Sequence, residues 1–193
     1  MTTLDYYSRN ASLYSARTLE ADLSDIYSRF TACLDKGMSI LDLGCGSGRD
    51  SLYFRSLGFD VTAADGCEEM CRIAGQNTGL EVRKLCFDEL DYSSAFNAVW
   101  ACSSLLHVPS DRLEAVFRLI HRALKPEGVF YSSFKYGSFE GERDGRYFTN
   151  LTEKSFSAFC IGLFAPADIW ITGDACPGRE NVKWLNAIVR KLN

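Results

Sequence analysis

Residues 39–50 read Ser-Ile-Leu-Asp-Leu-Gly-Cys-Gly-Ser-Gly-Arg-Asp, and this stretch decides the fold of the chain. The apolar run 40–43 leads into three glycines at alternate positions, Gly44, Gly46 and Gly48, and an amphipathic segment follows at once. Glycine tolerates backbone angles that other residues avoid, and it lets a ligand touch the main chain. A strand, a glycine turn and a helix N-terminus together make a nucleotide-sized pocket with free N–H groups pointing into it.

The spacing of the glycines separates two classes of cofactor. A dinucleotide-binding turn has the pattern G-x-G-x-x-G, with the pyrophosphate on the helix N-terminus. Here the third glycine comes one residue early, and Arg49 stands where the last glycine would be. Asp42 precedes the glycines, and a carboxylate there repels a diphosphate but suits the ammonium group of a cofactor without phosphates. A nicotinamide oxidoreductase is therefore the least favoured class of enzyme.

The rest of the chain alternates predicted strands and helices. We expect helices within 5–35, at 47–57, around 68–74, at 111–123 and at 152–164, and strands at 39–43, 59–64, 80–85, 96–102, 129–134, 167–172 and 182–189. This order predicts an α/β fold with a mostly parallel seven-stranded sheet and helices on both faces. The last two strands have no helix between them, which predicts an antiparallel C-terminal hairpin.

Three local details complete this prediction. The helix at 47–57 is expected to bury Leu52, Tyr53 and Leu57. The Lys-Pro-Glu-Gly segment at 125–128 predicts a turn, and 135–150 predicts a long polar loop of the kind that is functional or mobile in compact domains.

The composition is that of a globular domain without a nucleic-acid signature. Of the 193 residues, 47% are hydrophobic and 24% charged, and the net charge is −4 with no basic run, so a broad nucleic-acid footprint is disfavoured. The eight cysteines form no C-x-x-C pair and only two histidines accompany them, so no metal site is predicted and reduced thiols in a cytoplasmic protein are expected. No apolar run approaches the ~20 residues that span a bilayer, so no membrane partner is expected.

The segment 39–50 resembles motif I of the class I S-adenosyl-L-methionine (SAM) methyltransferases, and the likeness covers nearly all of 39–136. The block 41–65 is most similar to the tellurite-resistance-type, small-molecule branch, and the turn at 125–128 also fits the family. The resemblance implies a Rossmann-like fold, SAM as cofactor and S-adenosyl-L-homocysteine (SAH) as product. It divides a single domain, 1–193, into a helical N-terminal lid at 1–38, a SAM-binding core at 39–134, and an acceptor loop with C-terminal helix and hairpin at 135–193.

The residues expected to hold SAM lie at the carboxyl ends of the strands, where ligands of open α/β sheets bind. Asp65 would accept both ribose hydroxyls, since an ionised carboxylate only accepts hydrogen bonds. Phe87 would stack on adenine, and Asp88 would accept from its amine. The full cofactor set implied by the family motifs is Asp42, Gly44, Cys45, Gly46, Gly48, Asp65, Gly66, Met70, Phe87, Asp88, Ala101 and Cys102. Each carboxylate also has a structural alternative: a cap of the glycine turn for Asp42, a helix N-cap for Asp65, and a solvated turn residue for Asp88.

The methyl group should be transferred beside the segment 100–109, which resembles the Leu-His motif of many small-molecule methyltransferases. The sulfonium of SAM is already an activated electrophile, so the protein mainly positions two reactants and needs a base only where the nucleophile carries a proton. The candidate catalytic residues are His107, Tyr7 and Arg146, and packing and hydrogen bonding beneath the loop is the structural alternative for His107. The segment lacks the Asn-Pro-Pro-Tyr-like residues of enzymes that methylate exocyclic amines of DNA and RNA.

The expected acceptor pocket combines the lid with the polar loop. Its candidate substrate-binding residues are Tyr6, Tyr14, Lys135, Arg146 and Tyr147. Lys135 and Arg146 would bind an anionic acceptor or an oxyanion such as tellurite or selenite. The favoured function is thus methyl transfer from SAM to a small molecule by a monomer or homodimer. A tRNA-modifying methyltransferase and a non-catalytic SAM-binding partner protein stay open as alternatives.

Overall fold

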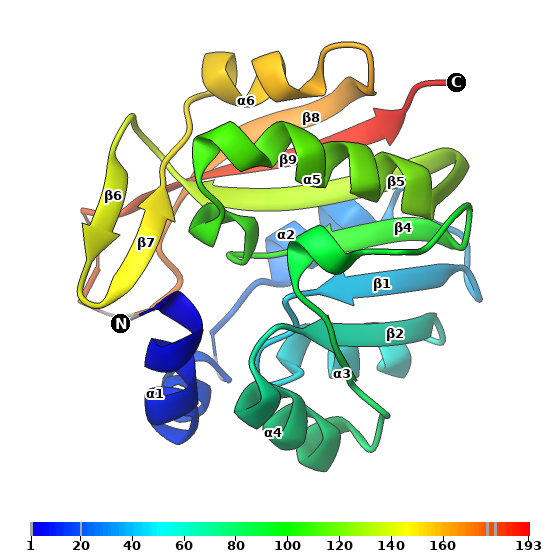
Figure 1. Ribbon diagram of the computed structural model, residues 1–193. Coiled ribbons are helices and arrows are strands. Elements are labelled where there is room, and N and C mark those ends of the chain that lie inside the picture. The colour runs from blue at the N-terminus through cyan, green and yellow to red at the C-terminus, as the bar shows by residue number, and fades with distance from the viewer. Residues whose placement is uncertain (1, 20, 177, 180) are drawn as a thin grey trace.

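A seven-stranded sheet forms the centre of the computed structural model, which describes residues 2–19, 21–176, 178–179 and 181–193 (Figure 1). The strands are β1 (Ser39–Leu43), β2 (Asp60–Asp65), β3 (Arg83–Lys84), β4 (Phe96–Ala101), β5 (Leu124–Lys135), β8 (Phe164–Gly173) and β9 (Lys183–Lys191). Their order is β3-β2-β1-β4-β5-β9-β8. The first five strands are parallel and β9 is antiparallel to both neighbours, so the predicted fold class is confirmed. The Cys-Pro-Gly segment 176–178, which the sequence predicts as the turn between the last two strands, includes Pro177, which lies outside the described residues.

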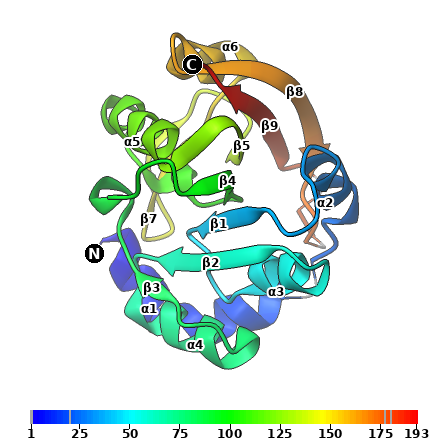
Figure 2. The same ribbon diagram turned by 90° about the vertical axis from the view of Figure 1, so that its right-hand side faces the viewer.

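Helices cover both faces of this sheet. They are α1 (Thr3–Thr18), α2 (Ser24–Thr31), α3 (Arg49–Ser56), α4 (Glu68–Thr78), α5 (Ser110–Ala123) and α6 (Glu153–Cys160), with 3-10 turns η1 (Phe87–Glu89) and η2 (Leu105–His107). Neighbouring strand residues point to opposite faces, so Leu41 packs with α5 and α6 whereas Ile40 packs with α2 and α3. Figure 2 shows α5 on one side of the sheet and α2 and α3 on the other.

Helix α3 buries a different face from the predicted one. Leu52 and Leu57 are 47% and 41% exposed, and only Tyr53 is partly buried, so the prediction was wrong for both leucines. The side chains that point inward are Asp50, Ser51 and Phe54. Phe54 fills the core, while Asp50 and Ser51 form hydrogen bonds to buried partners, and these polar contacts override the apolar pattern of the helix.

The segment 135–150 is a β-hairpin and not the predicted loop. Strands β6 (Glu140–Arg143) and β7 (Arg146–Thr149) pair antiparallel around Asp144 and Gly145, whose φ angles are 51° and 75°. Asp-Gly is a preferred sequence for such a two-residue turn. The hairpin stands apart from the central sheet and lies beside the start of α1 (Figure 1), where the Tyr147 amide donates to Thr3 Oγ1 at 3.0 Å.

Three predicted boundaries also need correction. The strand expected at 80–85 is reduced to two residues in β3. Residues 125–128 lie within β5, whose pairing with β4 shifts register there because Glu127 takes a φ of 61°. The helix expected at 152–164 ends at Cys160, and Gly162 with a φ of 72° then turns the chain into β8.

Candidate active site

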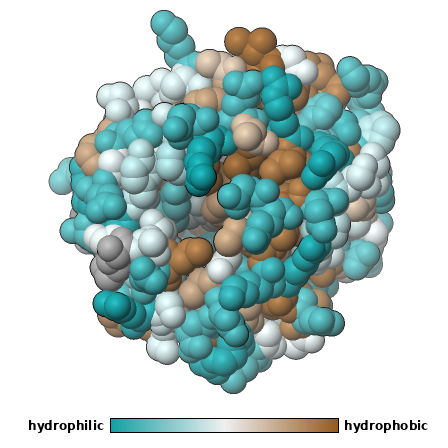
Figure 3. All heavy atoms as spheres, viewed as in Figure 1, coloured by the Kyte–Doolittle hydropathy of each residue, from teal (hydrophilic) through white to brown (hydrophobic). Residues whose placement is uncertain are grey.

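A cavity of about 1000 Å³ opens at the carboxyl ends of β1, β2 and β4. The glycine turn, α1, η2, the end of β5 and the β6–β7 hairpin all contribute side chains to its walls. Figure 3 shows the surface hollowed near the middle of the view, with both hydrophilic and hydrophobic side chains around the opening. One cavity therefore meets both the predicted cofactor residues and the predicted acceptor residues.

The glycine turn is held tightly against the end of β2. The amides of Gly44 and Cys45 both donate to the Ala64 carbonyl, at 2.8 and 3.0 Å. Gly44 has a φ of 80°, and a Cβ atom there would lie 2.4 Å from the Ser104 Cβ, so only glycine fits. The main chain can thus line the cavity directly at this position.

Asp65 ends β2 at the cavity wall with both carboxylate oxygens fixed. Its Oδ2 accepts from the Gly46 amide at 2.9 Å, and its Oδ1 accepts from the Cys67 amide at 2.8 Å. Burial raises the pKa of Asp65, while these two amides oppose that rise. A carboxylate oxygen can accept more than one hydrogen bond, so both oxygens can also accept from a neighbouring diol.

Asp42, Gly48 and Ala101 do not line the cavity, although the sequence analysis placed them with the cofactor. Asp42 is 1% exposed and accepts from Ser51 Oγ at 2.6 Å, beneath the glycine turn. Its burial, followed by the charge of Asp50, raises the pKa of Asp42 to about 8. A cap beneath the turn, the structural alternative for Asp42, fits this geometry.

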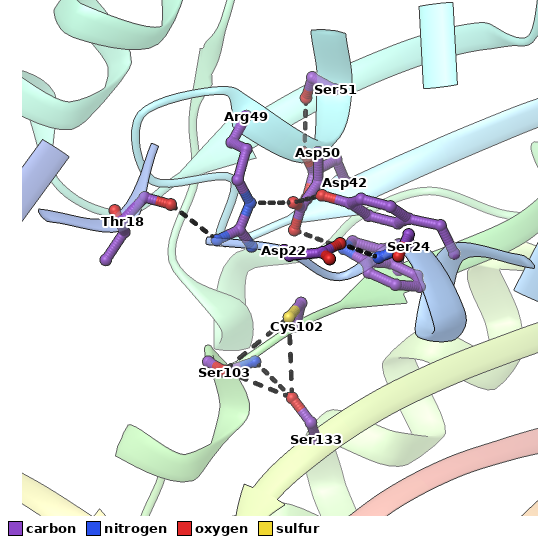
Figure 4. A network of polar contacts seen from close by, with 12 residues as sticks. Thr18, Asp22, Ser24, Asp42, Arg49, Asp50, Ser51, Cys102, Ser103 and Ser133 are labelled. Atoms are coloured by element: carbon purple, nitrogen blue, oxygen red, sulfur yellow. Dashed lines mark hydrogen bonds and ion pairs between the residues drawn. The ribbon is translucent and has the colours of Figure 1, made fainter. Parts of the chain in front are cut away.

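The other predicted cofactor residues all line the cavity, namely Gly44, Cys45, Gly46, Asp65, Gly66, Met70, Phe87, Asp88 and Cys102. The burial of Cys102 raises the pKa of its thiol to about 11, so the thiol stays protonated at neutral pH. It lies 3.8 Å from the hydroxyls of Ser103 and Ser133, and the Ser103 amide donates to Ser133 Oγ at 2.8 Å (Figure 4). These groups give the cavity a neutral polar wall after β4.

A buried network around Asp50 was missed by the sequence analysis. Asp50 Oδ1 accepts from the Tyr27 hydroxyl and from Arg49 Nε, and Oδ2 accepts from Trp100 Nε1 at 2.8 Å. Burial raises the pKa of Asp50, but Arg49 and the hydroxyl and indole donors outweigh burial and hold that pKa below its usual value. Arg49 also donates to the Thr18 carbonyl at 3.0 Å (Figure 4), so the network joins α1, α2, α3 and β4. The only signal of this network in the sequence was the charged pair Arg49 and Asp50, directly after Gly48.

On the acceptor side, His107 forms hydrogen bonds with both ring nitrogens. Its Nε2 lies 2.8 Å from the Tyr7 hydroxyl oxygen, and its Nδ1 lies 2.6 Å from the Tyr147 carbonyl oxygen. Tyr7 and His107 both line the cavity, together with Tyr6 and Tyr14. Tyr147, a predicted substrate residue, does not line the cavity, and its hydroxyl donates to Glu140 Oε1 at 2.8 Å. Its link to the site is the hydrogen bond between its backbone carbonyl and His107.

Arg146 and Lys135 bring positive charge to the same wall. The guanidinium of Arg146 lies 4.4 Å from the ring centre of Tyr6 and 5.1 Å from that of Phe148, and its buried Nε has no hydrogen-bond partner. The ammonium of Lys135 lies 4.0 Å from the Phe148 ring centre. Burial, followed by the charge of Arg146, lowers the pKa of Lys135. The site therefore holds cations that local carboxylates only partly neutralise.

Two negative observations apply to the part of the chain that the structure describes. Within it, no group of three or more histidine, cysteine, aspartate or glutamate residues could hold a metal ion. Over the same residues, no helix combines the length and apolar character needed to cross a membrane. All eight cysteines are free.

Comparison with known proteins identifies similar sequences and folds. A family model described as a methyltransferase domain matches residues 40–128, a little under half of the chain. The Bacillus subtilis protein YqeM, named as a methyltransferase, is 30% identical over 141 residues, which is 67% of this chain and 57% of that protein. TehB of Haemophilus influenzae, named as a SAM-dependent methyltransferase, is 39% identical over 61 residues, 32% of this chain and 18% of that protein. The chain thus spans less than two thirds of the length of these relatives.

A solved structure has the same fold over almost the whole chain. The 1,6-didemethyltoxoflavin-N1-methyltransferase of Burkholderia thailandensis, solved with 1,6-didemethyltoxoflavin and SAH, superposes with a TM-score of 0.77. The alignment has 23% identity and covers 98% of this chain and 85% of that chain. At this identity the likeness concerns the fold, including the N-terminal helices and the C-terminal strands.

Proposed function

The chain belongs to the class I SAM-dependent methyltransferase family, and on that premise we propose that it transfers a methyl group from SAM to a small-molecule acceptor. The observation that carries the proposal is the single cavity of about 1000 Å³ that joins Asp65 and the glycine turn to His107 and Arg146. Methyl transfer is an in-line displacement, so the two reactants must share one enclosed space. SAM supplies the activated methyl group, and the residues of this chain bind and orient it.

The proposed cofactor end runs from η1 to β4. Asp65 accepts the two ribose hydroxyls with oxygens that the Gly46 and Cys67 amides already orient. Phe87 and Asp88, which line the cavity in η1, receive the adenine. Gly44 and Cys102 would hold the methionine part, and residues of α1 and η2 line the same cavity.

The proposed acceptor is an anion, in keeping with the charges at the other end of the cavity. Arg146, which lines this end of the cavity, provides a fork for a carboxylate or an oxyanion, and Lys135 adds a point charge. Arg143 and Arg179 also line this end. An anion would relieve the repulsion that contributes to the lowered pKa of Lys135.

Calorimetric titration of the purified protein with SAH, with NADH as control, tests the cofactor assignment. We expect saturable one-to-one binding of SAH and none of NADH. Absence of SAH binding would refute the assignment and the enzyme function with it. SAH binding without methylation of any acceptor would favour a non-catalytic SAM-binding subunit, and salt-sensitive binding of tRNA would favour the RNA-modifying alternative.

A further inference from the structure

The two hydrogen bonds of His107 determine which ring nitrogen carries the proton. A backbone carbonyl only accepts hydrogen bonds, so Nδ1, at 2.6 Å from the Tyr147 carbonyl oxygen, must be the protonated nitrogen of the neutral ring. Nε2 then has a free electron pair, and the Tyr7 hydroxyl donates to it at 2.8 Å. Tyr7 itself lines the cavity, so its hydroxyl group lies between the cavity and His107.

The surroundings of His107 keep it neutral. Burial lowers its pKa to about 4, and the charges of Arg146 on β7 and Lys135 on β5 act in the same direction, while the Tyr147 carbonyl opposes them. The ring is therefore unprotonated at neutral pH and able to receive a proton at Nε2.

The surroundings of Tyr7 act on the charge of its oxygen in both directions. Burial raises the pKa of Tyr7, as does the charge of Asp65 on β2. Arg146 and the Tyr14 hydroxyl, on β7 and α1, favour the phenolate and lower the pKa. Tyr7 is thus neutral in the resting site, but a negative charge that develops on its oxygen during proton transfer has stabilising partners.

We propose that Tyr7 is a catalytic base that passes its own proton to His107 as it takes one from the acceptor, so that the methylated atom is a hydroxyl oxygen or an N–H nitrogen. Here Tyr7 touches the acceptor, and His107 is a positioning residue that acts through Tyr7. The inference rests on the proposed methyltransferase function and specifies the acceptor further.

The step balances without any further reactant. The lone pair of the acceptor atom forms a bond to the methyl carbon while the carbon–sulfur bond breaks, and its electron pair stays on sulfur as neutral SAH. The acceptor proton moves to the Tyr7 oxygen, and the Tyr7 hydroxyl proton moves to His107 Nε2. The protonated ring of His107 then releases one proton to water through the cavity that it lines. Transfer of a methyl cation to a neutral hydroxyl makes its proton strongly acidic, so a weakly basic imidazole is sufficient.

This transfer of protons from the acceptor through Tyr7 to His107, the relay, distinguishes two kinds of anionic acceptor. A carboxylate that also carries a hydroxyl or N–H group has a proton to lose and needs the relay. Selenite would attack the methyl group with an electron pair on selenium that carries no proton, so the relay would have no part in its methylation. We therefore expect hydroxyl- or N–H-bearing carboxylates to be the better substrates.

The test measures SAH formation with protocatechuate, imidazoleacetate and selenite as probes, in the full chain and in two variants. Tyr7→Phe keeps the ring but removes the hydroxyl, and His107→Gln keeps a polar partner for Tyr7 but cannot take up a proton. His121→Gln is the matched control, because that half-buried histidine lies outside the cavity lining and bonds to the Leu192 carbonyl at 2.9 Å. Both relay variants should lose about 100-fold in kcat with protocatechuate or imidazoleacetate, with unchanged SAH affinity.

The pH profile separates the relay from a merely structural role. The full chain should turn over at a rate nearly independent of pH between 5 and 8, since the pKa of His107 is about 4. In His107→Gln the rate should rise with pH, by about tenfold per unit, as ionisation of the acceptor itself replaces the base. Turnover of selenite alone, or full rates in both relay variants, would overturn the relay, as would no turnover of any probe by a chain that binds SAH. If the full chain does not bind SAH, the proposed function is refuted, and the relay is refuted together with it.

Discussion

Asp42 and Asp65, on neighbouring strands, show how the position of one residue decides the role of a carboxylate. Asp42 lies inside β1 beneath the glycine turn, where Ser51 is its hydrogen-bond partner. Asp65 is the last residue of β2, and two backbone amides turn its oxygens toward the cavity. The carboxylate at the strand end can meet a ligand, whereas the one inside the strand supports the turn.

Replacing Asp65 with alanine should weaken SAH binding by at least about 100-fold. The change removes the acceptor of two ribose hydroxyls, and hydrogen bonds to a charged group contribute about 1.5–3 kcal/mol each. Calorimetric titration measures the affinity, and Asp91→Ala, at an exposed carboxylate paired with Arg83, is the matched control. Equal SAH affinity in the two variants would remove Asp65 from the ribose site.

Replacing Arg146 with alanine should raise KM for the acceptor at least about tenfold and leave KM for SAM unchanged, because Arg146 lines the proposed acceptor end of the cavity and hydrogen bonds to charged groups are strong. Steady-state kinetics with each substrate varied in turn separates the two constants. Arg118→Ala is the control, since Arg118 pairs with Glu114 on the exposed face of α5. Equal effects on both KM values would place Arg146 outside the acceptor site.

At the scale of elements, α1 is anchored at both ends to segments distant in sequence. Thr3, at its start, accepts from the Tyr147 amide in β7, and the Thr18 carbonyl at its end accepts from Arg49 in α3. Tyr7 reaches His107 between these two anchors. The helix therefore forms a wall of the cavity, and its placement depends on elements at the proposed cofactor end and at the proposed acceptor end.

Replacing Arg49 with alanine should loosen the last turn of α1 and lower the free energy of unfolding. The change leaves the buried Asp50 carboxylate without its cation, which costs about 3–5 kcal/mol in general. We expect the low end, because Tyr27 and Trp100 still donate to Asp50. Hydrogen exchange of the α1 amides and chemical denaturation measure the two effects. Arg72→Ala, at an exposed pair in α4, should change neither, and identical exchange in both variants would refute the anchoring role.

At the scale of the whole molecule, burial of Asp42 links stability to pH. The pKa of Asp42 is about 8 in the folded protein, above the ordinary range of an aspartate in the unfolded chain. Between about pH 4 and 8, the folded state therefore holds a proton on Asp42 that the unfolded state has already lost. The stabilising contribution of this group is complete below about pH 4 and disappears as pH rises through 8.

Thermal unfolding of the full chain and of Asp42→Asn between pH 4 and 8 tests this linkage. The full chain should lose Tm relative to the variant as pH rises, by at least about 3 °C, the shift that roughly 1 kcal/mol produces in a domain of this size. His107 acts with the opposite sign between its pKa of about 4 and its ordinary value, so the comparison between the two proteins isolates Asp42. Parallel Tm curves would show that Asp42 ionises normally.

The sequence by itself predicted most of the residues that line the proposed cofactor end of the cavity, although Asp42, Gly48 and Ala101 lie outside that lining. The alternate glycines and Asp65 could be interpreted because their roles follow from local backbone geometry: Gly44 needs a positive φ, and a residue that ends a parallel strand reaches the ligand edge of the sheet. Only the tertiary structure decided the acceptor half. Tyr7 and His107 are a hundred positions apart, the polar segment 135–150 became a hairpin, and α3 turned Asp50 inward while Leu52 stayed exposed. Such contacts depend on the packing of several distant segments and on buried hydrogen bonds, which no local pattern of residues encodes.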